Sequence, residues 1–120
     1  MRKENIVKDK SLNFAIRIVN LYKYLVTEKR ETVMSKQLLR CGTSIGANIR
    51  EAEQAQSRAD FISKQNIALK EANETEYWLE LLVKTGYITP NEYDSINTDC
   101  TELNKLLISI IKSTKQTINE

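Results

Sequence analysis

The sequence predicts an all-α fold, an antiparallel up-down-up-down four-helix bundle, and three observations lead to this prediction. Only three of the 120 residues are glycine and one is proline, whereas sheet proteins need many turns. Apolar residues recur three and four positions apart over four long segments, which is the spacing of one face of a helix. The links between the segments are short, so consecutive helices must alternate in direction. At this length, residues 1–120 are expected to form one domain.

The first helix is expected over about residues 11–29 and is apolar on two faces. We expect the first stripe to face the core, and it comprises Leu12, Ala15, Val19, Tyr22 and Val26. The second stripe comprises Phe14, Ile18, Leu21 and Leu25. Because one helix cannot turn both stripes toward the same core, the second stripe is expected to contact another subunit, with some of it covered by neighbouring helices of the same bundle.

The second helix is expected over about residues 33–56, with apolar and small residues in a strict four-three spacing. This is the packing seam of a left-handed bundle. Gly42 and Gly46 lie inside it, and each costs about 1 kcal/mol relative to alanine in a helix. Either another helix comes close at these two positions, or the helix bends there.

The third helix is expected over about residues 58–85, with Ser57 as its N-cap and Gly86 just past its end. It also carries apolar residues that point away from its own seam, where a tryptophan is a typical interface anchor. We expect these residues to contact another subunit, and they are Ile67, Trp78 and Leu81.

The fourth helix is expected over about residues 90–117 and has the sharpest start signal in the chain. Thr89 can accept a hydrogen bond from the amide three residues on, and Glu92 can reach back to the amide of Thr89. Pro90 between them fixes the backbone of the first helical turn. The sequence therefore predicts a capping box at this point.

Charge is distributed unevenly although the net charge is only +2. Residues 1–40 carry ten Lys or Arg against four Asp or Glu, and residues 41–100 carry five against ten. This pattern is compatible with a polyanion contact or with an ordinary solvated helical surface. The candidates for phosphate contacts are Lys8, Lys10, Lys36, Arg40, Arg50 and Arg58.

Several function classes are not favoured by the composition. The chain has no histidine, the commonest general base and metal ligand. The Gly42–Gly46 segment lacks the Gly-Lys-Ser/Thr ending of a phosphate-binding loop. Cys41 and Cys100 fall on apolar positions and are expected to be buried thiols. We therefore expect no enzyme activity, cofactor, metal or small-molecule substrate. Because the sequence has no apolar run of about 18 residues, which a membrane-spanning helix would need, we expect a cytoplasmic protein.

A strip of polar residues runs beside the seam of the second helix, at Arg40, Ser44, Asn48 and Glu51. Glu76 falls on the apolar side of the third helix. A charge near a core must be paired or hydrogen-bonded, so Arg40 or Asn48 is expected to bind Glu76. The result is either a structural network that fixes helix register or a functional pocket.

Two segments, Ser35–Ala52 and Ala68–Leu79, resemble a known protein family. The first contains the specific stretch Ser-Ile-Gly-Ala-Asn-Ile-Arg-Glu-Ala, which begins at Ser44. The family is that of the four-helix-bundle proteins encoded in 23S rRNA intervening sequences, often labelled ribosomal proteins. The likeness covers the chain from about Ile6 to Ile111 and shows no departure from the family pattern.

This resemblance implies an antiparallel four-helix bundle that forms a homo-oligomer, a ring of five. A related branch, the accessory variability proteins of retroelements, works with a reverse transcriptase and RNA, and no catalytic residues come with the likeness. Two functional hypotheses follow. One is an oligomeric module that binds structured RNA through Lys and Arg contacts to phosphates. The other is a protein-interaction scaffold with no nucleic-acid role.

Overall fold

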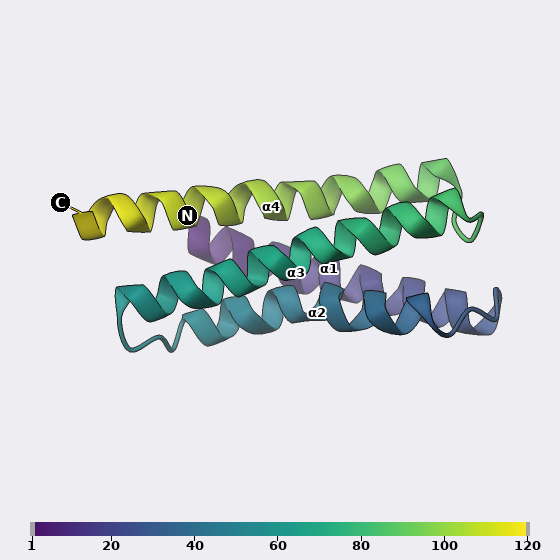
Figure 1. Cartoon of the computed structure of the whole chain (residues 1–120), viewed down its shortest axis with the longest axis horizontal. Coiled ribbons are helices and arrows are strands. Elements are labelled where there is room, and N and C mark those ends of the chain that lie inside the picture. The colour runs from purple at the N-terminus through teal and green to yellow at the C-terminus, as the bar shows by residue number, and fades with distance from the viewer. Residues whose placement is uncertain (1, 120) are drawn as a thin grey trace.

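Four α-helices run back and forth along one bundle in the computed structural model, which describes residues 2–119. They are α1 (Lys3–Thr27), α2 (Met34–Ala52), α3 (Arg58–Lys84) and α4 (Pro90–Asn119). The bundle measures 51 × 22 × 22 Å, and successive helices point in opposite directions (Figure 1). The described residues contain no strand. The predicted all-α, antiparallel four-helix bundle is therefore confirmed.

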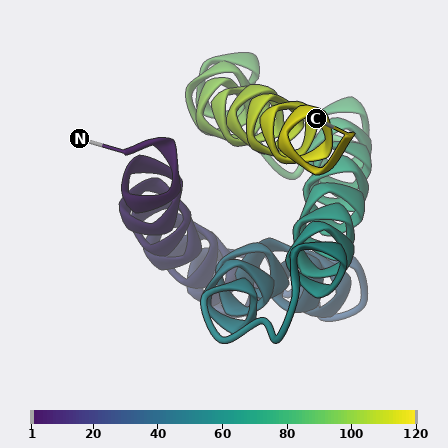
Figure 2. The ribbon, with the colours of Figure 1, turned by 90° about the vertical axis from the view of Figure 1, so that its left-hand side faces the viewer.

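The helices surround one core in the order in which they occur in the chain (Figure 2). Each packs against its neighbour in sequence, and α1 and α4 meet across the smallest of the four interfaces. A bundle with this topology brings both chain termini to the end where α2 turns into α3. Figure 1 shows this arrangement, with the opposite end formed by the α1–α2 and α3–α4 turns.

The first helix begins at Lys3, well before the predicted start at residue 11. The apolar stripe continues toward the N-terminus through Val7, which is fully buried. Ser11 does not cap a helix, because its hydroxyl donates to the carbonyl of Lys8 at 2.9 Å within the same helix. Tertiary burial of Val7 therefore extends the helix beyond its predicted start.

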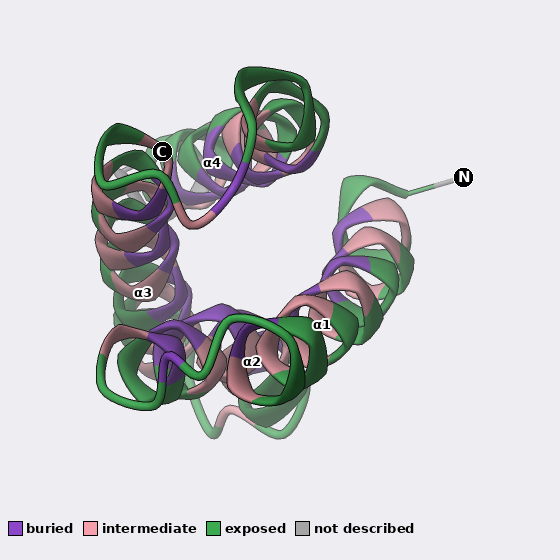
Figure 3. Cartoon of the chain, turned by 90° about the vertical axis from the view of Figure 1, so that its right-hand side faces the viewer, coloured by how far each residue is buried: buried purple, intermediate pink, exposed green. Residues whose placement is uncertain are grey.

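The two apolar stripes of α1 are exchanged relative to the prediction. Phe14, Ile18 and Leu25 are at most 2% exposed and belong to the core of this one chain, whereas Leu12 is 47% exposed. Figure 3 shows the buried residues of all four helices turned toward the common interior. Residues buried this completely cannot contact another subunit, so their assignment to an oligomer interface is wrong. Leu21, the fourth member of that stripe, is half-buried.

Two glycines of α2 explain why that stripe faces inward. A Cβ atom at Gly42 would lie 2.8 Å from Cγ1 of Ile18, and one at Gly46 would lie 3.2 Å from the hydroxyl of Ser11. The backbone of α2 is therefore within side-chain contact of α1. This confirms the prediction of a close helix approach at the glycines and fixes which side of α1 packs there.

The predicted signals at the two ends of α3 and at the start of α4 are confirmed in detail, whereas α2 ends at Ala52, before the predicted residue 56. Ser57 Oγ accepts from the backbone N–H of Asp60 at 3.1 Å, and Gly86 takes a left-handed conformation with φ of 85°. At the start of α4, the N–H of Thr89 donates to Glu92 at 2.8 Å, and the N–H of Glu92 donates to Thr89 at 3.1 Å. These two hydrogen bonds form the capping box that the sequence predicts.

The α1–α2 turn holds two features that the sequence did not indicate. Arg30 has a φ of 55°, a left-handed conformation that is uncommon for residues other than glycine. Glu31 is only 8% exposed, and its carboxylate accepts backbone N–H groups of Val33, Met34 and Ser35 at 2.7–3.0 Å. Glu31 thus satisfies three of the four free N–H groups at the start of a helix.

The outward residues of α3 are only partly exposed. Trp78 is half-buried, packs against the core, and donates its indole N–H to Glu74 at 3.0 Å. Leu81 is also half-buried. Ile67 is 38% exposed and Tyr77, whose ring meets that of Trp78 edge-on, is 57% exposed. The exposed apolar surface of α3 therefore centres on Ile67 and Tyr77 more than on Trp78.

None of the helices in residues 2–119 combines the length and the apolar character that a membrane crossing requires.

Candidate nucleic-acid interface

The end of the bundle where the chain starts and finishes carries an excess of positive charge. Residues 2–8, 50–60 and 109–116 contain seven Lys or Arg against four Asp or Glu. At the opposite end, residues 23–36 and 80–94 contain five of each. Six of these seven cations are exposed and are called the cationic end: Arg2, Lys3, Arg50, Arg58, Lys112 and Lys115.

The six side chains of the cationic end are in no ion pair within the described part of the chain. The acidic residues nearby are largely engaged elsewhere. Glu53 pairs with Lys8 at 3.2 Å and Glu51 with Lys64 at 3.5 Å. The carboxylate of Asp60 accepts the N–H of Gln56 at 3.3 Å. The positive charge of the cationic end is therefore not neutralised by ion pairs with nearby carboxylates.

Only part of the predicted phosphate-contact set lies here. Arg50 and Arg58 flank the α2–α3 turn and belong to the cationic end. Lys36 lies in the first turn of α2, at the opposite end. The remaining three are paired: Lys8 with Glu53, Lys10 with Glu102 at 3.0 Å, and Arg40 with Glu71 and Glu74.

Sequence reasoning missed Arg2, Lys3, Lys112 and Lys115, which complete the cationic end. Periodicity did not reveal them, because they lie near the chain ends where the apolar pattern fades. The signal that would have found them is the topology itself, since an up-down-up-down bundle places both termini beside the α2–α3 turn.

The polar strip of α2 does not bind Glu76, so that prediction is wrong. Arg40 reaches α3 but pairs with Glu71 and Glu74. Ser44 and Asn48 donate to backbone carbonyls one turn earlier in α2, at 2.6 and 2.8 Å. The last member, Glu51, forms the ion pair with Lys64.

Glu76 turns toward α4 instead. It accepts from the amide of Asn104 at 2.7 Å and from the hydroxyl of Thr101 at 3.3 Å. The physical requirement for a partner was predicted correctly, but the partner helix was not. The network therefore fixes α3 against α4 and leaves α2 out.

A row of polar contacts closes the seam between α1 and α4. Lys3 donates to Ser109 at 2.6 Å, Lys10 pairs with Glu102, and Arg17 bonds both Ser95 at 2.9 Å and Asp99 at 2.7 Å. The basic members lie seven residues apart on α1, and Ser109, Glu102 and Ser95 lie seven apart on α4. This is the register of two antiparallel helices whose facing positions repeat every two turns.

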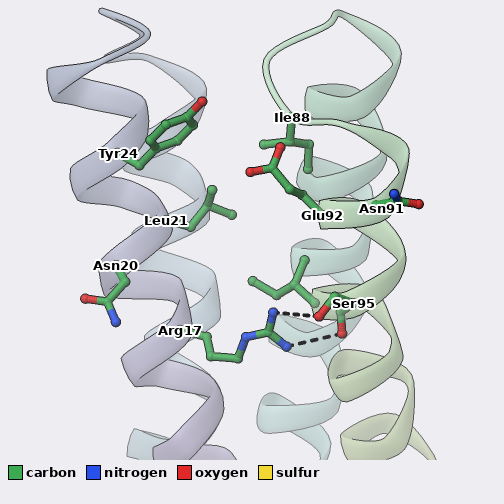
Figure 4. A pocket seen from close by; sticks show the side chains of 9 residues that line it. Arg17, Asn20, Leu21, Tyr24, Ile88, Asn91, Glu92 and Ser95 are labelled. Atoms are coloured by element: carbon green, nitrogen blue, oxygen red, sulfur yellow. Dashed lines mark hydrogen bonds between the residues drawn. The ribbon is translucent and has the colours of Figure 1, made fainter.

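Beyond Arg17 the row ends and a hollow of about 550 Å³ opens between α1, α4 and the α3–α4 turn. Its apolar wall is formed by Leu21, Ile88 and Ile96. Tyr24 leans over it from α1, while the Arg17 side chain crosses the seam to Ser95 at its lower edge (Figure 4). The other polar groups around it are Asn20, Asn91 and Glu92.

The two carboxylates nearest the hollow are occupied. The hydrogen bond from the N–H of Thr89 holds the pKa of Glu92 below its ordinary value, so this group stays ionised within the capping box. Asp99 is bound to Arg17. What remains to meet a ligand is the Tyr24 ring, the two asparagine amides and the apolar wall.

Other reactive groups lie away from this surface. Burial raises the pKa of the Cys41 and Cys100 thiols, which therefore stay protonated at neutral pH. No group of three or more potential metal ligands is found among the described residues. Within the described residues, the groups that face solvent are accordingly charged side chains, amides, hydroxyls and the exposed rings of Tyr24 and Tyr77.

Comparison with known proteins places the chain in a family. The family model described as 23S rRNA-intervening sequence protein matches residues 3–109. The chain is similar to a protein of unknown function from the S23 ribosomal protein family of Bacteroides thetaiotaomicron VPI-5482, whose crystal structure has been solved. The two sequences are 78% identical. The match covers 92% of this chain and 99% of that protein's chain, with a TM-score of 0.92. The comparison with curated proteins gives no match. This chain belongs to the 23S rRNA-intervening sequence protein family.

Proposed function

We propose that this protein is a non-enzymatic module that binds structured RNA by contacting its phosphates with the cationic end. The observation that carries the proposal is the set of six exposed Lys and Arg side chains, none of them in an ion pair within residues 2–116. Phosphate contacts give affinity and orientation but read little sequence. The protein is therefore expected to recognise charge and shape more than a particular base order.

Binding across a salt series tests the proposal. If four to six of these side chains contact phosphates, the logarithm of the association constant should fall with the logarithm of salt concentration with a slope of about −4 to −5 on duplex RNA. The double variant Arg50→Gln/Arg58→Gln should reduce that slope by about 2. Absence of binding at low salt would remove the RNA proposal and leave the protein scaffold as the remaining hypothesis.

A matched control comes from two exposed lysines in the middle of the bundle. Lys70→Gln/Lys105→Gln removes the same charge from α3 and α4, outside the cationic end. It should lower affinity only slightly and leave the salt slope unchanged. Equal effects of the two double variants would show that binding follows net charge and not this surface.

We also propose that the protein works as a homo-oligomer. Leu12 and Ile16 are 47% and 52% exposed one turn apart on α1, and Ile67 and Tyr77 are exposed on α3. Burial of such surface between subunits is favourable by about 25 cal/mol per Å². The family resemblance implies a ring of five, which would gather five cationic ends on one assembly and raise avidity for RNA.

Light scattering of the wild type and of two isoleucine variants tests the assembly. Ile16 and Ile108 are equally exposed at 52%, but only Ile16 has an exposed apolar neighbour one turn away on its own helix. Ile16→Lys should therefore shift the protein toward a smaller species, and Ile108→Lys should not. A monomeric wild type at micromolar concentration would contradict the proposal.

A further inference from the structure

We infer that the hollow between α1 and α4 receives an unpaired nucleobase, with the ring of Tyr24 as its stacking surface. The inference rests on the proposed RNA binding and adds a second kind of contact to it. The cationic end would supply contacts to phosphates, whereas the hollow would hold a base that has left its stack. Proteins commonly recognise single-stranded RNA in this way, on aromatic side chains.

The shape of the hollow suits a flat ring. It is an open depression of about 550 Å³ with an apolar wall of Leu21, Ile88 and Ile96. Tyr24 is 36% exposed, so part of its ring is available to a ligand. In Figure 4 the Tyr24 and Leu21 side chains project from α1 into the space opposite Ile88. A planar aromatic ligand placed there would cover apolar surface on both sides.

The polar groups around the hollow favour a neutral ring with hydrogen-bonding edges. Arg17 is already bound to Asp99 and Ser95, and Glu92 is bound to the N–H of Thr89, so neither charge awaits a counter-ion. Asn20 and Asn91 border the hollow on opposite helices, and in Figure 4 their amide groups lie at its outer rim. An amide has both a donor and an acceptor, as the edge of a nucleobase has.

Positive charge over one face of the ring fits the phosphate that a base brings with it. Lys29 Nζ lies over the Tyr24 ring, 5.9 Å from its centroid. Lys23 and Arg30 are exposed in the same segment. Of the nearby carboxylates, Glu31 is buried against backbone N–H groups, whereas Glu92 lines the hollow and Glu28 is exposed. Lys23, Lys29 and Arg30 are therefore the cations that the phosphate of a bound nucleotide would contact, at an end of the bundle where basic and acidic residues balance overall.

The hollow is bounded at both ends. Arg17 crosses the seam to Ser95 at one end (Figure 4), and the α3–α4 turn, through Ile88, bounds it at the other. Between these limits its wall on α1 runs from Arg17 to Tyr24, about two helical turns. A single base fits within this length.

The experiment compares two strands on three proteins. Binding of a single-stranded RNA and of an abasic ribose-phosphate strand of equal length is measured for wild type, Tyr24→Ala and Tyr24→Phe. We expect Tyr24→Ala to weaken RNA binding by about 5- to 150-fold, the range for loss of one stacked base. Affinity for the abasic strand should not change, and Tyr24→Phe should behave like wild type. Circular dichroism of each variant confirms that the bundle is intact.

The outcomes separate the two proposals. If RNA and the abasic strand bind equally well and Tyr24→Ala changes neither, RNA binding stands and the base site is overturned. If neither strand binds at low salt, the RNA proposal fails. Titration with the four nucleoside monophosphates then tests whether the hollow binds a mononucleotide. Amide NMR shifts confined to Ile88, Asn91 and Ser95 would support a mononucleotide site there. No shifts at millimolar concentration would overturn it.

Discussion

Glu31 should stabilise the fold far more than its place in a surface turn suggests. Its carboxylate accepts three backbone N–H groups at the start of α2, from Val33, Met34 and Ser35, while only 8% exposed. In Glu31→Ala these donors lose their acceptor at the end of a helix. An ordinary N-cap contributes about 1 kcal/mol, and the negative charge at the helix N-terminus adds about 0.3–1 kcal/mol. Because the group is buried and makes three bonds, we expect a loss of about 2–3 kcal/mol.

The measurement is urea unfolding followed by far-ultraviolet circular dichroism, with Glu28→Ala as the matched control. Glu28 is an exposed carboxylate of the same turn, and its removal should change the free energy of unfolding by less than about 0.5 kcal/mol. In a domain of this size, 2–3 kcal/mol corresponds to a fall of about 8–12 °C in Tm. Equal effects of the two variants would refute the assignment of Glu31 as the cap of α2.

The pH dependence gives an independent check. Burial alone would raise the pKa of Glu31, but the hydrogen bonds from Met34, Ser35 and Val33 outweigh it and leave the pKa below the ordinary 4.5. A carboxylate whose pKa is lowered by folding stabilises the native state above its unfolded pKa, and this contribution is lost as pH falls through the folded value. The stability gap between wild type and Glu31→Gln should therefore be constant near neutral pH and narrow in acid. A gap that widens on acidification would contradict the argument.

Three further substitutions test the packing. Gly42→Ala should cost about 1–3 kcal/mol, because its Cβ would lie 2.8 Å from Ile18 Cγ1; an unchanged Tm would mean that the helices separate at no cost. Glu76→Leu should cost about 1–3 kcal/mol by leaving the Asn104 amide without its acceptor, and adding Asn104→Leu should recover most of the loss in a double-mutant cycle. Arg30→Gly should raise stability by about 0.5–1 kcal/mol in thermal unfolding, since glycine adopts a φ of 55° without strain; a lower Tm would show that the arginine side chain matters more than its backbone.

Local signals in this sequence predict local structure well. The Ser57 cap, the Thr89–Glu92 capping box and the Gly86 helix end all depend on residues within one turn of one another, and all three occur as predicted. The close approach at Gly42 was predictable for a related reason, because glycine in a helix interior is costly unless the space is used.

Which face of α1 turns inward was not predictable, because both stripes have the same spacing and similar apolar content. The choice depends on α2, whose glycines accommodate Ser11 and Ile18 and not Leu12. Ion pairing likewise depends on which side chains a neighbouring helix presents. Arg40 was expected to contact phosphates or Glu76 and is paired with two other glutamates of α3. The cationic end was therefore found from topology and pairing, which sequence alone does not give.

The weakness of the α1–α4 seam connects the fold to the proposed base site. The contacts that close the seam, through Lys10 and Arg17, involve side chains about 40–50% exposed, and exposed pairs of this kind contribute only about 0–1 kcal/mol each. The firmer packing, with glycines against Ile18 and Ser11, lies between α1 and α2. A ligand that enters beside Tyr24 therefore displaces solvent and weak surface contacts and leaves the core intact. A lightly held seam beside one core shared by all four helices is a physical reason for a flat ligand to bind here.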